Sequence, residues 1–190
     1  GLADADETRQ TSTNRLLART TRQYHQDNGT AAGTVFPHLD ETVGYRYDPL
    51  DGRLLATSTQ SSQCDAYGNL VTETALLDDA ETGTTWQTVT TNTFTNNATN
   101  WRIGQLDQRL VTHYRNGVTS STDDLSTAFT YAAGTGALVG VTREPGKGAP
   151  YELASTYTLD AFGNRLTETV TGPGIATRST TATYTADGRF

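Results

Sequence analysis

Hydrophobic and polar residues alternate with a period of two over much of the chain. Val43, Tyr45 and Tyr47 share one face of an extended segment. Phe129 and Tyr131 share a face in the same way. This is the pattern of a half-buried β-strand, because a helix would repeat every 3.6 residues. Threonine weakens the contrast between the faces, so the pattern predicts an all-β chain with one modestly apolar face and one threonine-rich face.

Between these extended runs, an aspartate is repeatedly followed three or four residues later by a glycine. An aspartate side chain bonds nearby backbone N–H groups and opens a turn, and glycine supplies the positive φ that a hairpin with a G1 bulge requires. Each phrase therefore predicts a β-hairpin, and their recurrence indicates stacked repeats. The clear copies run from Asp48 to Gly52, Asp65 to Gly68 and Asp160 to Gly163, with further anchor glycines at Gly104, Gly136 and Gly188.

The remaining segments predict a polar N-terminal region over residues 1–40 and a repeat region over residues 41–190. Residues up to Thr13 are polar and are expected to fray. Residues 14–26 fit a strand or a helix, and the Thr20-Thr21 pair favours a strand. Residues 29–39 are expected to form a loop with an apolar tip at 35–37. Further loops are expected at residues 78–83, 116–124 and 144–150.

Composition narrows the class of protein. Hydrophobic residues make up only 34% of the chain, which suits disorder, but nine Tyr, five Phe and two Trp favour a folded sheet. The net charge of −7 argues against nucleic acid as a partner. No apolar run approaches the roughly 20 residues of a membrane-spanning helix. Cys64 is the only cysteine and is expected to be a small buried side chain.

The sequence predicts no catalytic, cofactor or metal site. His25, His38 and His113 are far apart and lack metal-ligand spacing. Acidic residues are plentiful, but none shows the order of a calcium loop or a defined catalytic pair. Trp86 and Trp101 are expected to pack into the core, with stacking on a sugar as the alternative. The chain has no Met and stops at Phe190 inside a repeat, so we expect a fragment of a longer protein.

The repeated phrases resemble the YD-repeat, or Rhs, family. Its pattern is an aromatic residue, Tyr-Asp, a short gap, Gly, then Arg or Asn and Leu. Residues 45–54 match nearly every slot, and residues 65–70 and 160–166 match the half from Asp to Leu. Residues 92–106 look like another recurring stretch, which ends in an Asn-Trp-x-x-Gly-x-Leu corner. Cys64 and Leu159 depart from the pattern, because they stand where the Tyr of Tyr-Asp belongs.

This resemblance, over residues 45–190, implies a fold and a role. The family includes bacterial Rhs toxins, the B and C components of insecticidal toxin complexes, and the animal teneurins. Their repeats form a curved strip of antiparallel hairpins that spirals into a hollow β-shell, and in the bacterial toxins the shell encloses a C-terminal effector. The motif residues are Tyr45, Tyr47, Asp48, Gly52, Asp65, Gly68, Trp101, Gly104, Tyr157, Asp160, Gly163 and Gly188.

We therefore expect a non-enzymatic wall segment of a secreted or cell-surface bacterial toxin. Its partners would be neighbouring repeats, the enclosed effector and other toxin-complex subunits. Exposed strand edges predict self-association. The alternative is a carbohydrate-binding or adhesive β-module.

Overall fold

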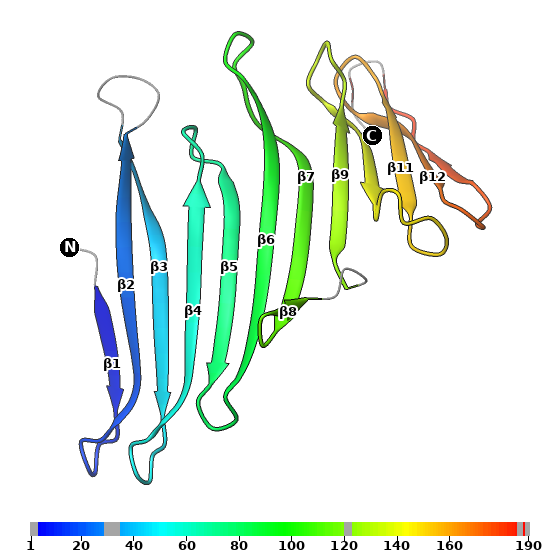
Figure 1. Cartoon of the computed structure of the whole chain (residues 1–190). Coiled ribbons are helices and arrows are strands. Elements are labelled where there is room, and N and C mark those ends of the chain that lie inside the picture. The colour runs from blue at the N-terminus through cyan, green and yellow to red at the C-terminus, as the bar shows by residue number, and fades with distance from the viewer. Residues whose placement is uncertain (1–3, 29–34, 120–122, 186–187, 189–190) are drawn as a thin grey trace. The chain divides into compact units, whose positions relative to one another are not determined.

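A computed structural model describes residues 4–28, 35–119, 123–185 and 188. These residues form thirteen β-strands and no helix (Figure 1), which confirms the all-β prediction. The strands are β1 (Ala5–Arg9), β2 (Leu16–Asn28), β3 (Val35–Tyr47), β4 (Leu54–Cys64), β5 (Leu70–Asp79), β6 (Thr84–Asn97), β7 (Arg102–Arg115), β8 (Val118–Thr119), β9 (Leu125–Tyr131), β10 (Leu138–Arg143), β11 (Leu153–Leu159), β12 (Arg165–Thr171) and β13 (Arg178–Thr181). With no helix in the described residues, no helical membrane span is found there.

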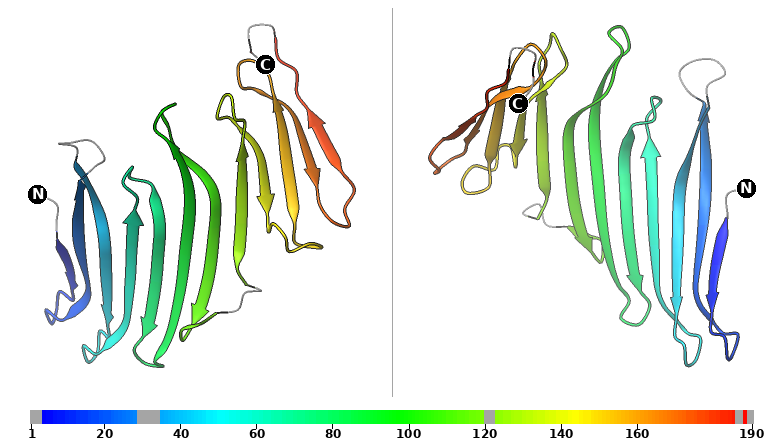
Figure 2. Two further views of the ribbon diagram at one scale, coloured as in Figure 1. Left: turned by 45° about the horizontal axis from the view of Figure 1, so that its top comes forward. Right: turned by 180° about the vertical axis from the view of Figure 1, so that it is seen from behind.

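The strands pair in the order in which the chain makes them. The sheet runs from β1 to β7 and on through β9 to β13, while the short β8 pairs only with β7. The described pairings are antiparallel, as expected for consecutive hairpins. Figure 2 shows β1 to β5 side by side in both views, each strand next to its sequence neighbour.

The chain divides into two units. Unit 1 comprises residues 1–92 and 111–124, and unit 2 comprises residues 93–110 and 125–190. Strands β6 and β7 each contribute to both units. Strands β1 and β2, which precede residue 41, belong to the same unit as β3.

Two sequence-based expectations about the N-terminal region are wrong. Residues 5–9 do not fray: β1 pairs with β2 from Ala5↔Thr21 to Arg9↔Leu16. Residues 35–39 are not a loop, because they pair with residues 24–28 as part of β3, while residues 29–34 lie outside the described residues. Cross-strand hydrogen bonds stabilise both segments, and local polarity does not reveal such partners. The strand expected within residues 14–26 is confirmed as β2.

A β-bulge follows the turn in five hairpins of the described chain. In each case the second strand contains one residue more than its partner, and the extra residue lies three positions after the residue with positive φ. A bulge shifts the side-chain alternation by one position. This explains why the period of two is imperfect in the sequence. The extra residues are all aliphatic and half-buried: Leu17, Leu55, Val71, Val139 and Leu166.

The described residues contain no buried hydrophobic side chain. The accessible surface is 12425 Å², whereas a compact monomer of 20.4 kDa exposes about 8,800 Å². The expected core positions of the tryptophans are wrong, since Trp86 is 40% and Trp101 82% exposed. Cys64 is half-buried rather than buried. A single-layer sheet has no second layer to cover its apolar residues.

Candidate functional site: the hairpin corners

We call the turn that closes a hairpin a corner. Two short corners share one hydrogen-bond pattern. At Asp65 the carboxylate accepts bonds from the N–H of Tyr67 (2.8 Å) and of Asn69 (2.9 Å) and from the Asn69 side chain (2.8 Å). The Gly68 N–H donates to the Asp65 carbonyl at 2.9 Å, and Gly68 has a φ of 83°. A three-residue turn followed by a left-handed residue is the predicted G1-bulge hairpin.

The Asp160 corner repeats this arrangement. Its carboxylate accepts bonds from the N–H of Phe162 (2.9 Å) and of Asn164 (2.8 Å) and from the Asn164 side chain (2.9 Å). Gly163 has a φ of 85°. The Asn164 amide also donates to the Gly188 carbonyl at 3.1 Å, so this corner contacts the next left-handed glycine, whose φ is 78°.

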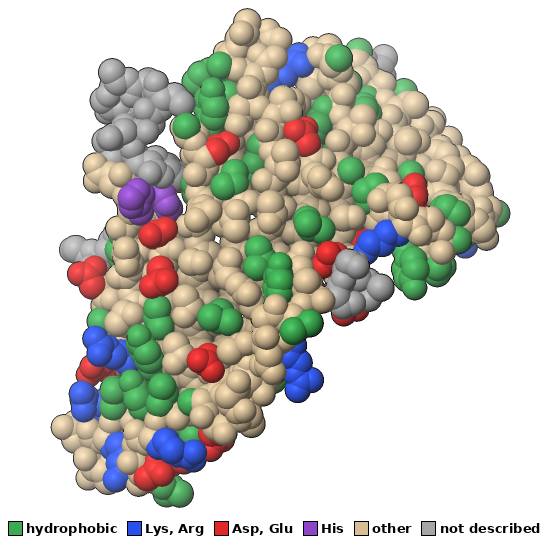
Figure 3. Space-filling model, viewed as in Figure 1, with side chains coloured by type: hydrophobic (Ala, Val, Ile, Leu, Met, Phe, Trp, Pro, Cys, Tyr) green, Lys and Arg blue, Asp and Glu red, His purple; other side chains and the backbone are tan. Residues whose placement is uncertain are grey.

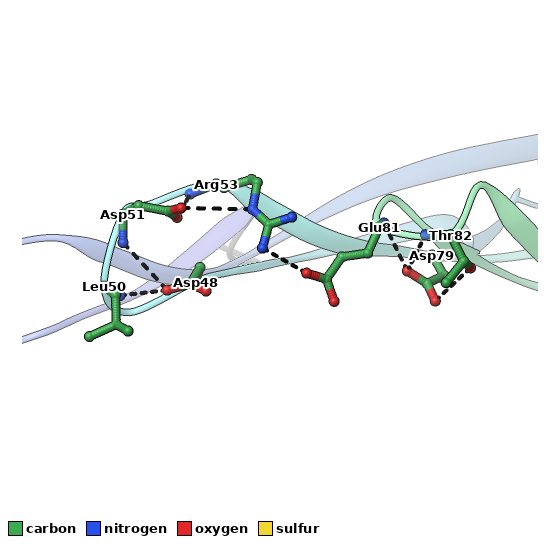
Figure 4. Close-up of polar contacts among 7 residues, drawn as sticks. All are labelled: Asp48, Leu50, Asp51, Arg53, Asp79, Glu81 and Thr82. Atoms are coloured by element: carbon green, nitrogen blue, oxygen red, sulfur yellow. Dashed lines mark hydrogen bonds and ion pairs between the residues drawn. The ribbon is translucent and has the colours of Figure 1, made fainter.

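The Asp48 corner is one residue longer than the predicted G1 type. The Gly52 N–H donates to the Asp48 carbonyl at 2.9 Å, which closes a four-residue step rather than three. Leu50 donates its N–H to the Asp48 carboxylate at 2.6 Å, and Arg53 donates to Asp51 at 2.8 Å (Figure 4). The longer offset from Asp to Gly in the sequence is the cause.

The sequence predicts loops at residues 78–83 and 116–124 and an anchor glycine at Gly136, but it does not predict the corner at Gln10–Asn14. Asp79 to Gly83 is a second long corner, in which the Asp79 carboxylate accepts bonds from Glu81 N–H and the Thr82 hydroxyl (Figure 4). Gln10–Asn14 and Ala132–Gly136 have the same backbone bonds without an aspartate. Asn116-Gly117 joins β7 to β8 with φ values of 51° and 73°. An Asn-Gly pair is a strong hairpin signal, and it would have revealed β8.

Hydrogen bonds lower the pKa values of two corner carboxylates, those of Asp79 and Asp160. Burial acts to raise the pKa of Asp160, but the bonds from Asn164, Phe162 and Gly163 outweigh it and hold that pKa below its ordinary value. The pKa of Asp79 is lowered chiefly by the Thr82 hydroxyl. Both corners therefore favour the ionised aspartate.

In three corners the residue after the left-handed position is an arginine, and its side chain contacts the neighbouring corner. Arg15 donates to the Pro49 carbonyl at 2.9 Å, and Arg53 lies 2.7 Å from Glu81 (Figure 4). Arg102 donates to the carbonyls of Ala133, at 2.6 Å, and Gly134. Asparagine at this position bonds the aspartate of its own corner instead. We call the three arginines the corner arginines.

The aromatic motif residues occupy different environments. Tyr45 and Tyr47 are half-buried on β3, and Tyr157 on β11 lies under the Arg165 guanidinium, 3.6 Å from the ring centroid. Trp101 is itself the left-handed residue of the β6–β7 turn, with a φ of 51°. Gly104 is not in that turn but inside β7, where its N–H donates to Asn96 at 2.8 Å.

The motif residues do not converge on one place. They recur at successive hairpins, and the hydrogen bonds of the described residues join members of single corners and link the Asp160 corner to Gly188. Among the described residues no group of three or more His, Cys, Asp or Glu side chains is arranged to hold a metal ion. His113 contacts Thr88 at 3.1 Å, whereas His25 and His38, thirteen residues apart in the sequence, lie side by side. The motif residues therefore form one structural unit that recurs from hairpin to hairpin.

No protein-family model and no curated protein matches the chain. Among solved structures, it is similar to a porin-like protein from Bacteroides uniformis ATCC 8492, with 14% identity, a TM-score of 0.24, and coverage of 89% of this chain and 86% of that one. It is also similar to a chain of the TcdB2-TccC3-Cdc42 structure, with 12% identity and a TM-score of 0.17. That match covers 87% of this chain and 13% of that chain, so the chain spans a small part of that neighbour's length.

Proposed function

We propose that the chain is a wall segment of a secreted or cell-surface bacterial YD-repeat toxin. In this proposal its hairpins continue into neighbouring repeats to form a shell around an effector, and it catalyses no reaction. The single observation that carries the proposal is a sheet of chain-ordered hairpins without a buried hydrophobic side chain among the described residues. Its excess surface of roughly 3,600 Å² exceeds a standard protein interface of about 1,600 Å². Such a sheet gains stability when other protein covers it.

Both faces of unit 1 carry apolar side chains among polar ones. Register places Val43, Leu76 and Val89 on one face among threonines and serines. Leu77 and Trp86 lie directly opposite each other on the other face. In the view of Figure 3 the hydrophobic side chains form small separate groups among polar ones. A surface without a large continuous apolar patch limits adhesion of a partly folded cargo.

Photo-crosslinking tests the proposal in the full polypeptide that contains the chain. A benzophenone amino acid is placed at Thr59, on the Val43 face, or at Gln60, the adjacent position on the Trp86 face. A wall predicts cross-links to a C-terminal effector from one position only, because one face would lie inside. If neither position formed cross-links to protein, the proposal would be contradicted.

A second candidate function is carbohydrate binding, and the surface around Trp86 favours it. A hollow of about 380 Å³ is lined by the indole, Leu77, Gln60 and Thr88 among others. An exposed aromatic ring beside amide and hydroxyl groups suits the apolar face and the hydroxyls of a sugar. Glycan-array binding that disappears in Trp86→Ala but persists in Trp101→Ala would support this function. Binding that survives Trp86→Ala would exclude this surface.

A further inference from the structure

We propose that His25 and His38 form a binding site for a late first-row divalent metal ion, such as Cu²⁺, Ni²⁺ or Zn²⁺. The inference is independent of the proposed wall function. It also departs from the sequence-based expectation of no metal site, which rested on the distance between the histidines along the chain.

The β2–β3 hairpin places the two imidazoles opposite each other. His25 pairs directly with His38 in the antiparallel ladder, so both side chains leave the same face of the sheet. Their ring centroids are 5.8 Å apart at an interplanar angle of 62°. His25 is exposed and His38 half-buried, so an ion from solvent reaches the pair from the side of His25.

The spacing of the rings fits a shared ion. An ion bound at about 2.0–2.1 Å to one nitrogen of each ring would hold the centroids roughly 5 Å apart in tetrahedral geometry and roughly 4.5 Å apart at adjacent positions of a tetragonal Cu²⁺ ion. Rotation of the two side chains closes the difference from 5.8 Å. A cross-strand pair is also held at constant separation by the backbone hydrogen bonds of the sheet, so little ordering is required when an ion binds.

A hollow that contains two acidic residues lies near the pair and is lined by residues of β2, β3, β4 and β5. Gln23 precedes His25 by two residues, about 7 Å along the strand, and lines a hollow of about 270 Å³. Asp40 and Glu41 line it too, two and three residues after His38. Asp40 is the extra residue of a β-bulge, since Gln23 pairs with Glu41 and the following residue pairs with Leu39. The bulge therefore places two acidic residues two and three positions after His38 on the same strand.

The electrostatics of this region favour a cation. No Lys or Arg is among the described residues that line the hollow, and the other lining residues are Ser, Thr and Gln. In Figure 3 a purple histidine patch is bordered by red acidic side chains. The carboxylates add negative charge, and water can complete the coordination sphere of an ion that the imidazoles hold.

The donor set selects the class of ion. Imidazole nitrogens suit Cu²⁺, Ni²⁺ and Zn²⁺, whereas Ca²⁺ and Mg²⁺ require oxygen ligands. For a fixed nitrogen and oxygen site, affinity rises from Ni²⁺ to Cu²⁺ and falls again at Zn²⁺. We therefore expect Cu²⁺ to bind most tightly and Ca²⁺ and Mg²⁺ not to bind.

Calorimetric titration of the 190-residue chain with chlorides of these five metals tests the site. His25→Asn and His38→Asn should each weaken Cu²⁺ binding by about tenfold or more, since loss of even an outer-shell group costs about that much. His113→Asn is the matched control, because His113 contacts Thr88 on another part of the sheet, and it should leave the affinity unchanged. Circular dichroism verifies that each variant keeps its strands.

Electron paramagnetic resonance of the Cu²⁺ complex provides a second readout that does not depend on affinity. Coupling of the copper to two imidazole nitrogens is expected in the parent chain and to one in either single variant. Unchanged affinity in the His25→Asn, His38→Asn double variant would overturn the proposal. Loss of binding in His113→Asn alone, or absence of Cu²⁺ binding to the parent chain, would overturn it as well.

Discussion

The corners end in residues with a left-handed backbone conformation. The free-energy cost of this conformation depends on the type of residue that adopts it. Glycine adopts a positive φ without strain, whereas a side chain at such a position costs about 1–2 kcal/mol unless it is asparagine. Most positions here are glycine, while Asn14 and Asn116 have φ values of 54° and 51°. Trp101, at 51°, and Glu144, at 49°, are the costly exceptions. Substitutions at these positions isolate the backbone contribution to each corner.

Gly163→Ala should lower the free energy of unfolding by about 1 kcal/mol or more. Gly163 has a φ of 85°, and an added Cβ would meet nothing within 4 Å, so the loss comes from backbone strain and not from a clash. Gly163→Asn should be less destabilising. Gly134→Ala is the control, since Gly134 lies in a turn without positive φ and also has open space. Urea unfolding measures all three, and an equal loss at both glycines would contradict the strain argument.

Two corner aspartates, Asp79 and Asp160, make the free energy of unfolding depend on pH. The pKa of Asp160 is lower in the folded chain than its ordinary value of 3.8, so its stabilising effect is complete above that pH. The effect is lost as pH falls from about 3.8 through the lower folded pKa, because the unfolded chain then binds more protons. Asp79, whose pKa is lowered in the same direction, adds to this loss.

Asp160→Asn should therefore be less stable than the parent chain at neutral pH, and the difference should shrink in acid. A protonated aspartate no longer offers the carboxylate that the corner N–H groups favour. Thermal unfolding at a series of pH values between neutral and pH about 2 measures the difference. Asp78→Asn, at an exposed strand position outside any corner, is the control. If the difference in thermal stability between the parent chain and Asp160→Asn stayed constant with pH, the charge of the carboxylate would be irrelevant to stability.

At the scale of the elements, the corner arginines connect one hairpin to the next. Arg102 donates hydrogen bonds to two carbonyls of the Ala132–Gly136 turn. Its side chain also packs against this turn, since a Cβ added to Gly136 would lie 3.0 Å from the Arg102 Cδ atom. Arg102→Met keeps the aliphatic stem and removes those bonds, so it should cost about 1 kcal/mol and increase exchange of the Gly136 N–H. Arg53→Met should have little effect, because Arg53 and Glu81 are 53% and 50% exposed. Hydrogen exchange measured by NMR distinguishes the two, and equal effects would contradict a specific role for carbonyl contacts.

The sequence predicts hairpins at Asp48, Asp65 and Asp160, where Asp and Gly both stand at a corner, but only a loop at Asp79 to Gly83. It failed where the geometry uses other residues: Gln10 and Asn14 form a long corner without either, so β1 was expected to fray. The aliphatic bulges shift the alternation that identifies faces, which obscured the register. His25 and His38 meet only because the β2–β3 pairing opposes them, and that register depends on a bulge at Asp40. Local patterns specify turns, whereas pairing partners decide what becomes adjacent.

At the scale of the whole chain, stability comes from neighbouring strands, because the described residues have no shared hydrophobic core. The exposed 12425 Å² means that the chain buries roughly 58% of the surface its unfolded form would expose, the fraction typical of a domain of about 60 residues. Repeat arrays of this kind unfold in segments rather than all at once. The remaining exposed apolar area and the strand edges favour association with other protein, which the net charge of −7 opposes.

We therefore predict self-association that strengthens with protein concentration and with salt, since salt screens the repulsion between like-charged copies. Sedimentation velocity measures it, and a monomer at every concentration and ionic strength would contradict the prediction. Two variants locate the contact. Thr8→Lys with Thr180→Lys places charges on β1 and β13 and should suppress association through strand edges. Trp86→Ser removes the exposed indole from a face and should leave edge pairing intact, so stronger suppression by Trp86→Ser would assign the contact to the face of the sheet.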